Sequence, residues 1–191
     1  MKSALKLVKD EIKGNEKHRF ANRTYSQLVE KIVELPAPED ALLTEFVEEY
    51  VNKYYDLQYY FLVDAAYLSH PACSPSHGRK SLEKGVNDTT LHTILTSMTP
   101  LLPLDDTQTT FFTALPTTST ILRPENYKVA FQSLWLAYLR KSLSPAHLKQ
   151  VVLIVHKRII PYMNRPPLLM DFLTDVYNQG CPLQSHLSKP R

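Results

Sequence analysis

The chain has 191 residues, of which 43% are apolar and 21% are charged, and its formal net charge is only +3. This size supplies one hydrophobic core or two small ones, and the charge balance excludes a polycation. Two cysteines without a motif exclude a disulfide scaffold, and the charged N-terminus and short apolar runs predict a soluble intracellular protein with no signal peptide or membrane span.

Helical periodicity dominates the chain, which contains only four glycines, so we predict an all-α fold. A short helix is expected over 4–13 and a second over 24–35, before Pro36 and Pro38. One long helix is predicted from about Glu39 to Leu68. Its apolar stripe follows the spacing of a helix face and consists of Phe46, Tyr50, Tyr54, Leu57 and Phe61.

The second half predicts four more helices. One covers 88–98, and a Thr/Pro-rich linker follows over 99–122. The next covers 125–143 and turns four residues inward, namely Val129, Leu134 (or Phe131), Trp135 and Tyr138. Ser144 is a good N-cap for a helix that runs to Ile160, and a last helix follows Pro166-Pro167 and ends at Gly180. Short links between consecutive helices predict antiparallel neighbours, as in a HEAT-like or armadillo-like solenoid.

Charge is distributed unevenly along the chain. Residues 34–64 hold eight acids against Lys53, whereas residues 123–165 hold eight bases against Glu125. Such blocks either steer partners or are neutralised and solvated within the protein.

Candidate chemistry is sparse. His70, Cys73 and His77 lie close together, but a structural zinc site needs a fourth ligand, so we predict no metal site and an ordinary polar loop. Asp171 and Asp175 share a helix face, where capping or solvation is the simpler interpretation. No phosphate loop or nucleophile motif is present in the sequence, so we predict no catalytic residue and no cofactor.

Two stretches carry a family resemblance. "EFVEEYVNKYYDLQYYF" and the segment 131–180 resemble the nucleolar complex protein 4 family, ribosome-biogenesis factors with a CCAAT-binding-factor domain. The second stretch contains Trp135, then His-Lys-Arg-Ile-Ile-Pro at 156–161, then Leu-Met-Asp-Phe-Leu-Thr-Asp at 169–175. The Thr/Pro-rich composition of 99–122 and the resemblance together divide the chain into an N-terminal helical region (1–98), the linker (99–122), the start of a CCAAT-binding-factor-type helical domain (123–180) and a tail (181–191).

The resemblance implies a non-catalytic nucleolar protein with a helical-repeat fold. Family members pair with nucleolar protein 14 and act in small-subunit assembly, 18S ribosomal RNA maturation and pre-ribosome export. The tail "GCPLQSHLSKPR" departs from the family, whose helical domain continues, so we expect a C-terminally shortened chain. A non-functional truncated product and a DNA-binding CCAAT-type transcription factor remain alternatives. The second is disfavoured because the bases spread over several helices.

Five residues are candidate contacts for a partner or for pre-ribosomal RNA. Lys157 and Arg158 lie within the apolar segment 151–177, where they either complement a helix dipole or reach a partner, and Arg165 follows them. Tyr59 and Tyr60 belong to an aromatic cluster that is able to stack on bases. Because that cluster is surrounded by acids and keeps helical spacing, core or protein interface is favoured over RNA.

Overall fold

The structure is a computed structural model that describes residues 23–35, 40–69, 86–102 and 123–178. Within these ranges every regular element is helical and no strand occurs, so the all-α prediction is confirmed. Three predictions concern segments outside the described residues. These are the helix over 4–13, the loop that carries His70, Cys73 and His77, and most of the Thr/Pro-rich linker.

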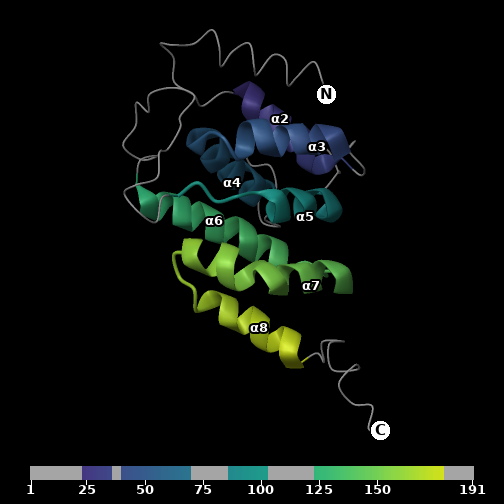
Figure 1. The fold of residues 1–191 in the computed structure, drawn as a ribbon, viewed down its shortest axis with the longest axis vertical. Helices are drawn as coiled ribbons and strands as arrows, with labels where there is room; N and C mark the ends of the chain where they lie inside the picture. The colour runs from purple at the N-terminus through teal and green to yellow at the C-terminus, as the bar shows by residue number, and fades with distance from the viewer. Residues whose placement is uncertain (1–22, 36–39, 70–85, 103–122, 179–191) are drawn as a thin grey trace, which may run out of the picture.

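The helices are stacked one below another along the long axis of the molecule, from α2 at the top to α8 at the bottom (Figure 1). Two π-helical turns, η1 and η2, and one 3-10 turn, η3, join or extend them. In chain order the elements are α2 (Arg23–Glu34), α3 (Asp40–Phe46), η1 (Val47–Val51), α4 (Tyr55–Ser69), α5 (Asp88–Ser97), α6 (Pro124–Leu139), α7 (Pro145–Ile154), η2 (Val155–Ile159), η3 (Ile160–Tyr162) and α8 (Leu168–Asn178).

Helices two places apart in the chain pack side by side. α2 packs on α4, α4 packs on α6, and α5 packs on α7, which is the neighbour pattern of a helical-repeat solenoid. One hydrophobic core therefore runs from Tyr25 in α2 to Leu169 in α8. The domain boundary placed at 99–122 remains a prediction, and the helices on its two sides share this core.

Local sequence signals fix several elements as expected. The α2 stripe is fully buried and consists of Leu28, Val29, Ile32 and Val33. Asn87 caps α5, since its side chain accepts a hydrogen bond from the Thr90 amide at 3.0 Å. Ser144 caps α7 in the same way through the His147 amide at 3.2 Å, so this predicted cap is confirmed.

The predicted long helix from Glu39 to Leu68 is wrong in one respect: it is broken into α3, η1 and α4. The break falls at Asn52, whose side chain donates to the Ser97 carbonyl at 3.2 Å and accepts from the Thr99 amide at 2.7 Å. These bonds to a distant segment compensate for the lost helical bonds. The aromatic stripe survives the break, because its five members are buried or pack against the core.

Two details of α6 differ from expectation. Val129 is 46% exposed instead of inward, because α6 turns Tyr127, Phe131 and Leu134 toward α4. The helix also ends at Leu139, four residues earlier than predicted. The predicted burial of Trp135 is confirmed.

The α-helical part of α7 ends at Ile154, not at Ile160. Helical turns continue as η2 and η3, and they keep Val155 and Ile159 buried. Pro161 explains why regular α-helix does not persist, because proline has no amide hydrogen to bond the carbonyl one turn earlier.

The described side chains of α8 lie on two different faces. Leu169 is fully buried, and Phe172 and Leu173 pack against the core. Leu168 and Met170 are 42% and 56% exposed, on a face that no further described helix covers. The end of the described stack is therefore apolar.

Trp135→Ala is predicted to lower the free energy of unfolding by roughly 3 to 5 kcal/mol, the usual range for loss of a large core aromatic. The indole contacts the rings of Phe131 and Tyr138. Its Nε1 atom has no hydrogen-bond partner among the described residues, so packing is the main loss. Urea denaturation is the measurement. Val129→Ala, on the same helix but exposed, is the control and should cost less than about 1 kcal/mol; a loss that small for Trp135→Ala would contradict the assigned core.

Candidate functional site

A buried amide ties three segments of the stack together. The Gln58 side-chain nitrogen donates to the Val51 carbonyl at 3.0 Å and to the Thr99 carbonyl at 2.9 Å. Its oxygen accepts from the Leu101 amide at 2.8 Å and from the Tyr127 hydroxyl. Gln58 is fully buried, so each of these bonds replaces one that water makes in the unfolded chain. The amide thereby fixes where η1, the 98–102 segment and α6 meet.

A second polar cluster joins α5, α6 and α7. The Nε2 atom of buried His92 donates to the Gln150 side-chain oxygen, and its Nδ1 atom accepts from the Tyr138 hydroxyl at 2.6 Å. The His147 ring stacks on it with centroids 3.9 Å apart. Burial lowers the pKa of His92, the hydrogen bond to Gln150 opposes this, and the nearby His147 lowers the pKa further. Because burial is the largest of these effects, the neutral form of the imidazole is favoured.

The two adjacent bases, Lys157 and Arg158, occupy different environments. The Arg158 guanidinium donates to the Thr96 carbonyl at 2.7 Å and to the Met98 carbonyl, both at the C-terminal end of α5. Positive charge is favourable there because the last carbonyls of a helix carry partial negative charge. Lys157 is exposed. The dipole interpretation therefore applies to Arg158, although at the end of a neighbouring helix instead of its own.

The other candidate contacts lie apart from this pair. Arg165 is exposed, and its backbone amide donates to the Gln132 side chain at 2.6 Å. Tyr59 and Tyr60 lie half-buried on α4 with their rings edge to face, 5.6 Å between centroids. Burial raises the pKa of both hydroxyls, so they are neutral at physiological pH. The structure does not bring the five candidates into one cluster.

The described residues contain no group of three His, Cys, Asp or Glu side chains arranged to hold a metal ion. Asp171 is exposed on α8, and the side chain of Asp175 lies outside the description. Across the same described ranges, no helix is long and apolar enough to cross a membrane.

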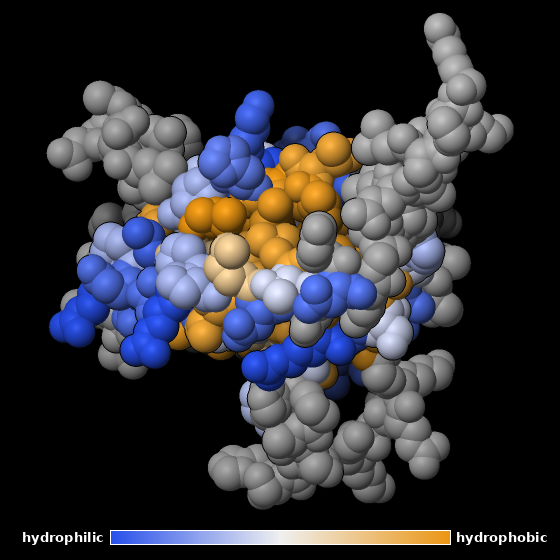
Figure 2. Space-filling model, turned by 90° about the horizontal axis from the view of Figure 1, so that it is seen from below, coloured by the Kyte–Doolittle hydropathy of each residue, from blue (hydrophilic) through white to orange (hydrophobic). Residues whose placement is uncertain are grey.

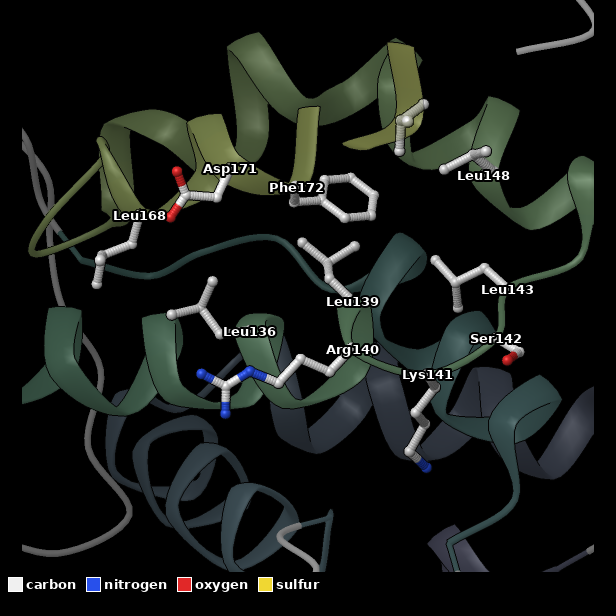
Figure 3. A pocket seen from close by; sticks show the side chains of 11 residues that line it. Leu136, Leu139, Arg140, Lys141, Ser142, Leu143, Leu148, Leu168, Asp171 and Phe172 are labelled. Atoms are coloured by element: carbon white, nitrogen blue, oxygen red, sulfur yellow. The ribbon is translucent and has the colours of Figure 1, made fainter. Parts of the chain in front are cut away.

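A groove with a volume of about 700 Å³ lies between α8 and the C-terminal half of α6 (Figure 3). We call it the α6–α8 groove. Phe172 points down from α8 toward Leu139 on α6, and Arg140 and Asp171 lie on the near side. Its lining consists of Leu136, Leu139, Arg140, Lys141, Ser142, Leu143, Leu148, Leu168, Asp171, Phe172 and Val176.

The same end of the molecule is apolar when it is seen from below (Figure 2). Apolar side chains gather at the centre of this view, and charged ones lie along parts of its edge. The large exposed apolar residues of α7 and α8 are Leu153, Leu168 and Met170. A face of this kind is typical of an interaction surface.

Sequence reasoning missed Gln58, His92 and Arg140. Gln58 carried a usable signal, because it is a polar residue on the apolar side of α4 next to Leu57. No sequence signal marked His92 or Arg140. The hydrogen-bond partners of His92 lie on α6 and α7, and Arg140 lines a groove whose other wall is α8.

Comparison with known proteins agrees with the fold. A family model described as "Nucleolar complex protein 4-like, TPR repeats" matches residues 1–71. Nucleolar complex protein 4 of Saccharomyces cerevisiae is 30% identical over 170 residues, which cover 83% of this chain and 29% of that protein. An uncharacterized protein of Schizosaccharomyces pombe is 29% identical over 174 residues, covering 91% and 36% respectively. The mouse homolog of nucleolar complex protein 4 is 28% identical over 169 residues, covering 86% and 31%.

The stacked helices and the apolar end face define a helical-repeat protein of the kind that serves as an interaction scaffold. Its sequence agrees over most of its length with relatives from Saccharomyces cerevisiae, Xenopus laevis and mouse whose names refer to the nucleolus. The chain belongs to the nucleolar complex protein 4 family. It spans about a third of the length of the relatives that it matches most extensively.

Gln58→Ala is predicted to lower the free energy of unfolding by about 3 kcal/mol or more. The substitution removes a hydrogen-bond partner from the Val51 carbonyl, the Thr99 carbonyl and the Tyr127 hydroxyl, and a buried polar group left unpaired costs roughly 1 to 3 kcal/mol. Chemical denaturation provides the measurement. Gln27→Ala, at an exposed position of α2, is the matched control and should change stability by no more than about 0.5 kcal/mol. Equal effects of the two substitutions would refute the role of the amide.

The stability of the chain is predicted to fall as pH falls through the range below the ordinary His pKa of 6.5. Because the pKa of His92 is lower in the folded chain, the unfolded chain binds the proton first as pH falls. The stabilisation is therefore complete above the ordinary pKa of 6.5, and it is lost as the pH falls toward the lower folded-state pKa. His92→Gln should flatten the pH dependence of the unfolding free energy, and His156→Gln, at an exposed position, should not. An unchanged slope in His92→Gln would contradict the assignment.

Proposed function

We propose that the chain is a non-catalytic ribosome-biogenesis factor that acts in the nucleolus as a scaffold for protein partners. The family membership and the uncovered apolar end of a helical-repeat stack support this proposal. A repeat stack presents extended surfaces to partners and needs no reaction centre. We further propose small-subunit assembly, 18S ribosomal RNA maturation and pre-ribosome export as the process, with a nucleolar protein 14-type protein and the small-subunit pre-ribosome as partners.

The candidate contacts enter this proposal with different roles. Lys157 and Arg165 are exposed bases, suited to pre-ribosomal RNA or to an acidic partner. The half-buried Tyr59 and Tyr60 offer aromatic edges to a protein surface. Arg158 contributes chiefly by holding η2 against α5, because its guanidinium is bound to carbonyls there.

Affinity purification of the tagged full chain from nuclear extract is the test. The expected result is recovery of small-subunit pre-ribosomal proteins, retained after RNase treatment because the contact is with protein. The double substitution of Lys157→Glu with Arg165→Glu should reduce the recovery at least about threefold at low salt, where exposed charges act most strongly. Lys31→Glu, an exposed base on the distant α2, is the matched control.

Two outcomes would contradict the proposal. Recovery of chromatin proteins and sequence-specific DNA would favour the transcription-factor alternative. Recovery of neither class, from extract in which a full-length relative recovers pre-ribosomes, would favour a non-functional product.

A further inference from the structure

Apolar side chains line the α6–α8 groove from both of its walls, beside the polar side chains of Arg140, Lys141, Ser142 and Asp171. Leu136 and Leu139 line it from α6, and Leu168 and Phe172 line it from α8 (Figure 3). Leu168 is well exposed, and Phe172 is only partly covered by the core. Apolar side chains from two helices thus face a volume of about 700 Å³ that no described residue fills.

The charged side chains in the groove lining are those of Arg140, Lys141 and Asp171. Arg140 is exposed in the groove lining, and no ion pair engages its side chain among the described residues. The neighbouring Lys141 is already paired with Asp88 at 2.6 Å. Arg140 is therefore the cation available to an occupant, and Asp171 is the only acid in the lining.

The dimensions of the groove suit a helix. α8 has 11 residues, so the groove wall that it forms is roughly 16 Å long, about three helical turns. Helices recognised in grooves present apolar side chains at helical spacing along one face. We propose that the α6–α8 groove binds an amphipathic helix of a partner protein, with aliphatic side chains between Leu139 and Phe172 and an acidic side chain on Arg140.

A second copy of the chain fits this groove less well. Among the described side chains of α8, the large apolar ones that are exposed are Leu168 and Met170, which lie within one turn of each other. Its remaining apolar face is occupied by Leu169, Phe172 and Leu173 against the core. An inserted α8 would therefore fill one turn of a groove that is about three turns long.

Fluorescence anisotropy with purified full chain tests the inference. The probe is a labelled synthetic helix of about 18 residues with leucines along one stripe and glutamates beside it, long enough to span the groove. A second probe replaces the glutamates with lysines. The chain should bind the glutamate probe at least about tenfold more tightly than the lysine probe, because like charges across a contact are costly.

Four variants make the test specific. Arg140→Glu should reverse the preference between the two probes, and Leu168→Ser should weaken binding of both. Lys149→Glu and Leu153→Ser are the matched controls, since they change an exposed base and an exposed leucine outside the groove lining, and each should alter binding by less than about threefold. Unchanged helical circular dichroism in every variant separates lost binding from lost fold.

Three results would overturn the inference. One is the absence of binding to either probe, which is also the result expected if residues 179–191 of the chain occupy the groove. Another is an unchanged charge preference in Arg140→Glu. The third is a concentration-dependent dimer in sedimentation that Leu168→Ser abolishes, because it would assign the groove to a second copy.

The inference rests on the proposed scaffold function, but the assay uses no ribosomal material. Peptide binding without recovery of pre-ribosomes would refute the function alone, and the opposite pair of results would refute the groove alone.

Discussion

The arrangement of the stack depends on the buried side-chain amide of Gln58. It has two hydrogen-bond donors and one acceptor oxygen, and all are used by groups from other segments. An amide buried without partners would cost several kcal/mol, so the bonds constrain geometry as well as energy. The turn at η1 must present the Val51 carbonyl, the 98–102 segment must lie extended beside α4, and α6 must bring Tyr127 to the same point. The close packing of α4 on α6 follows from this requirement.

Elements whose determinants are local were predictable from sequence. The apolar stripe of α2 and the Ser144 cap depend on residues within a few positions of each other. The break at Asn52 was not predictable, because the aromatic stripe continues through it and its compensating partners, Ser97 and Thr99, lie more than forty residues away. Val129 was misassigned for a related reason: adjacent apolar residues on α6 compete to face the core, and α4 decides which of them do so.

The candidate site was less predictable than the fold, because charge has no fixed role outside its surroundings. Lys157 and Arg158 are neighbours of the same charge, yet Arg158 is bound to carbonyls of α5 whereas Lys157 is exposed. Which of two adjacent bases is available to a partner depends on where another helix ends. Arg140 belongs to no sequence motif. It becomes a candidate contact only because α8 places apolar side chains beside it in the groove.

Binding at the end of the stack is coupled to the order of α8. Among the side chains of α8 that are described, Leu169 alone is fully buried, and the contribution of Phe172 is limited because the groove leaves its ring partly uncovered. An occupant of the α6–α8 groove would cover that ring and would bind only when α8 is in place, so its binding free energy would add to the stability of the helix. Leu168 and Met170 of α8 are also exposed, and burying such side chains against a partner is favourable. The apolar side chains at this end of the described stack therefore gain from association, which is a physical reason for a scaffold to bind its partner there.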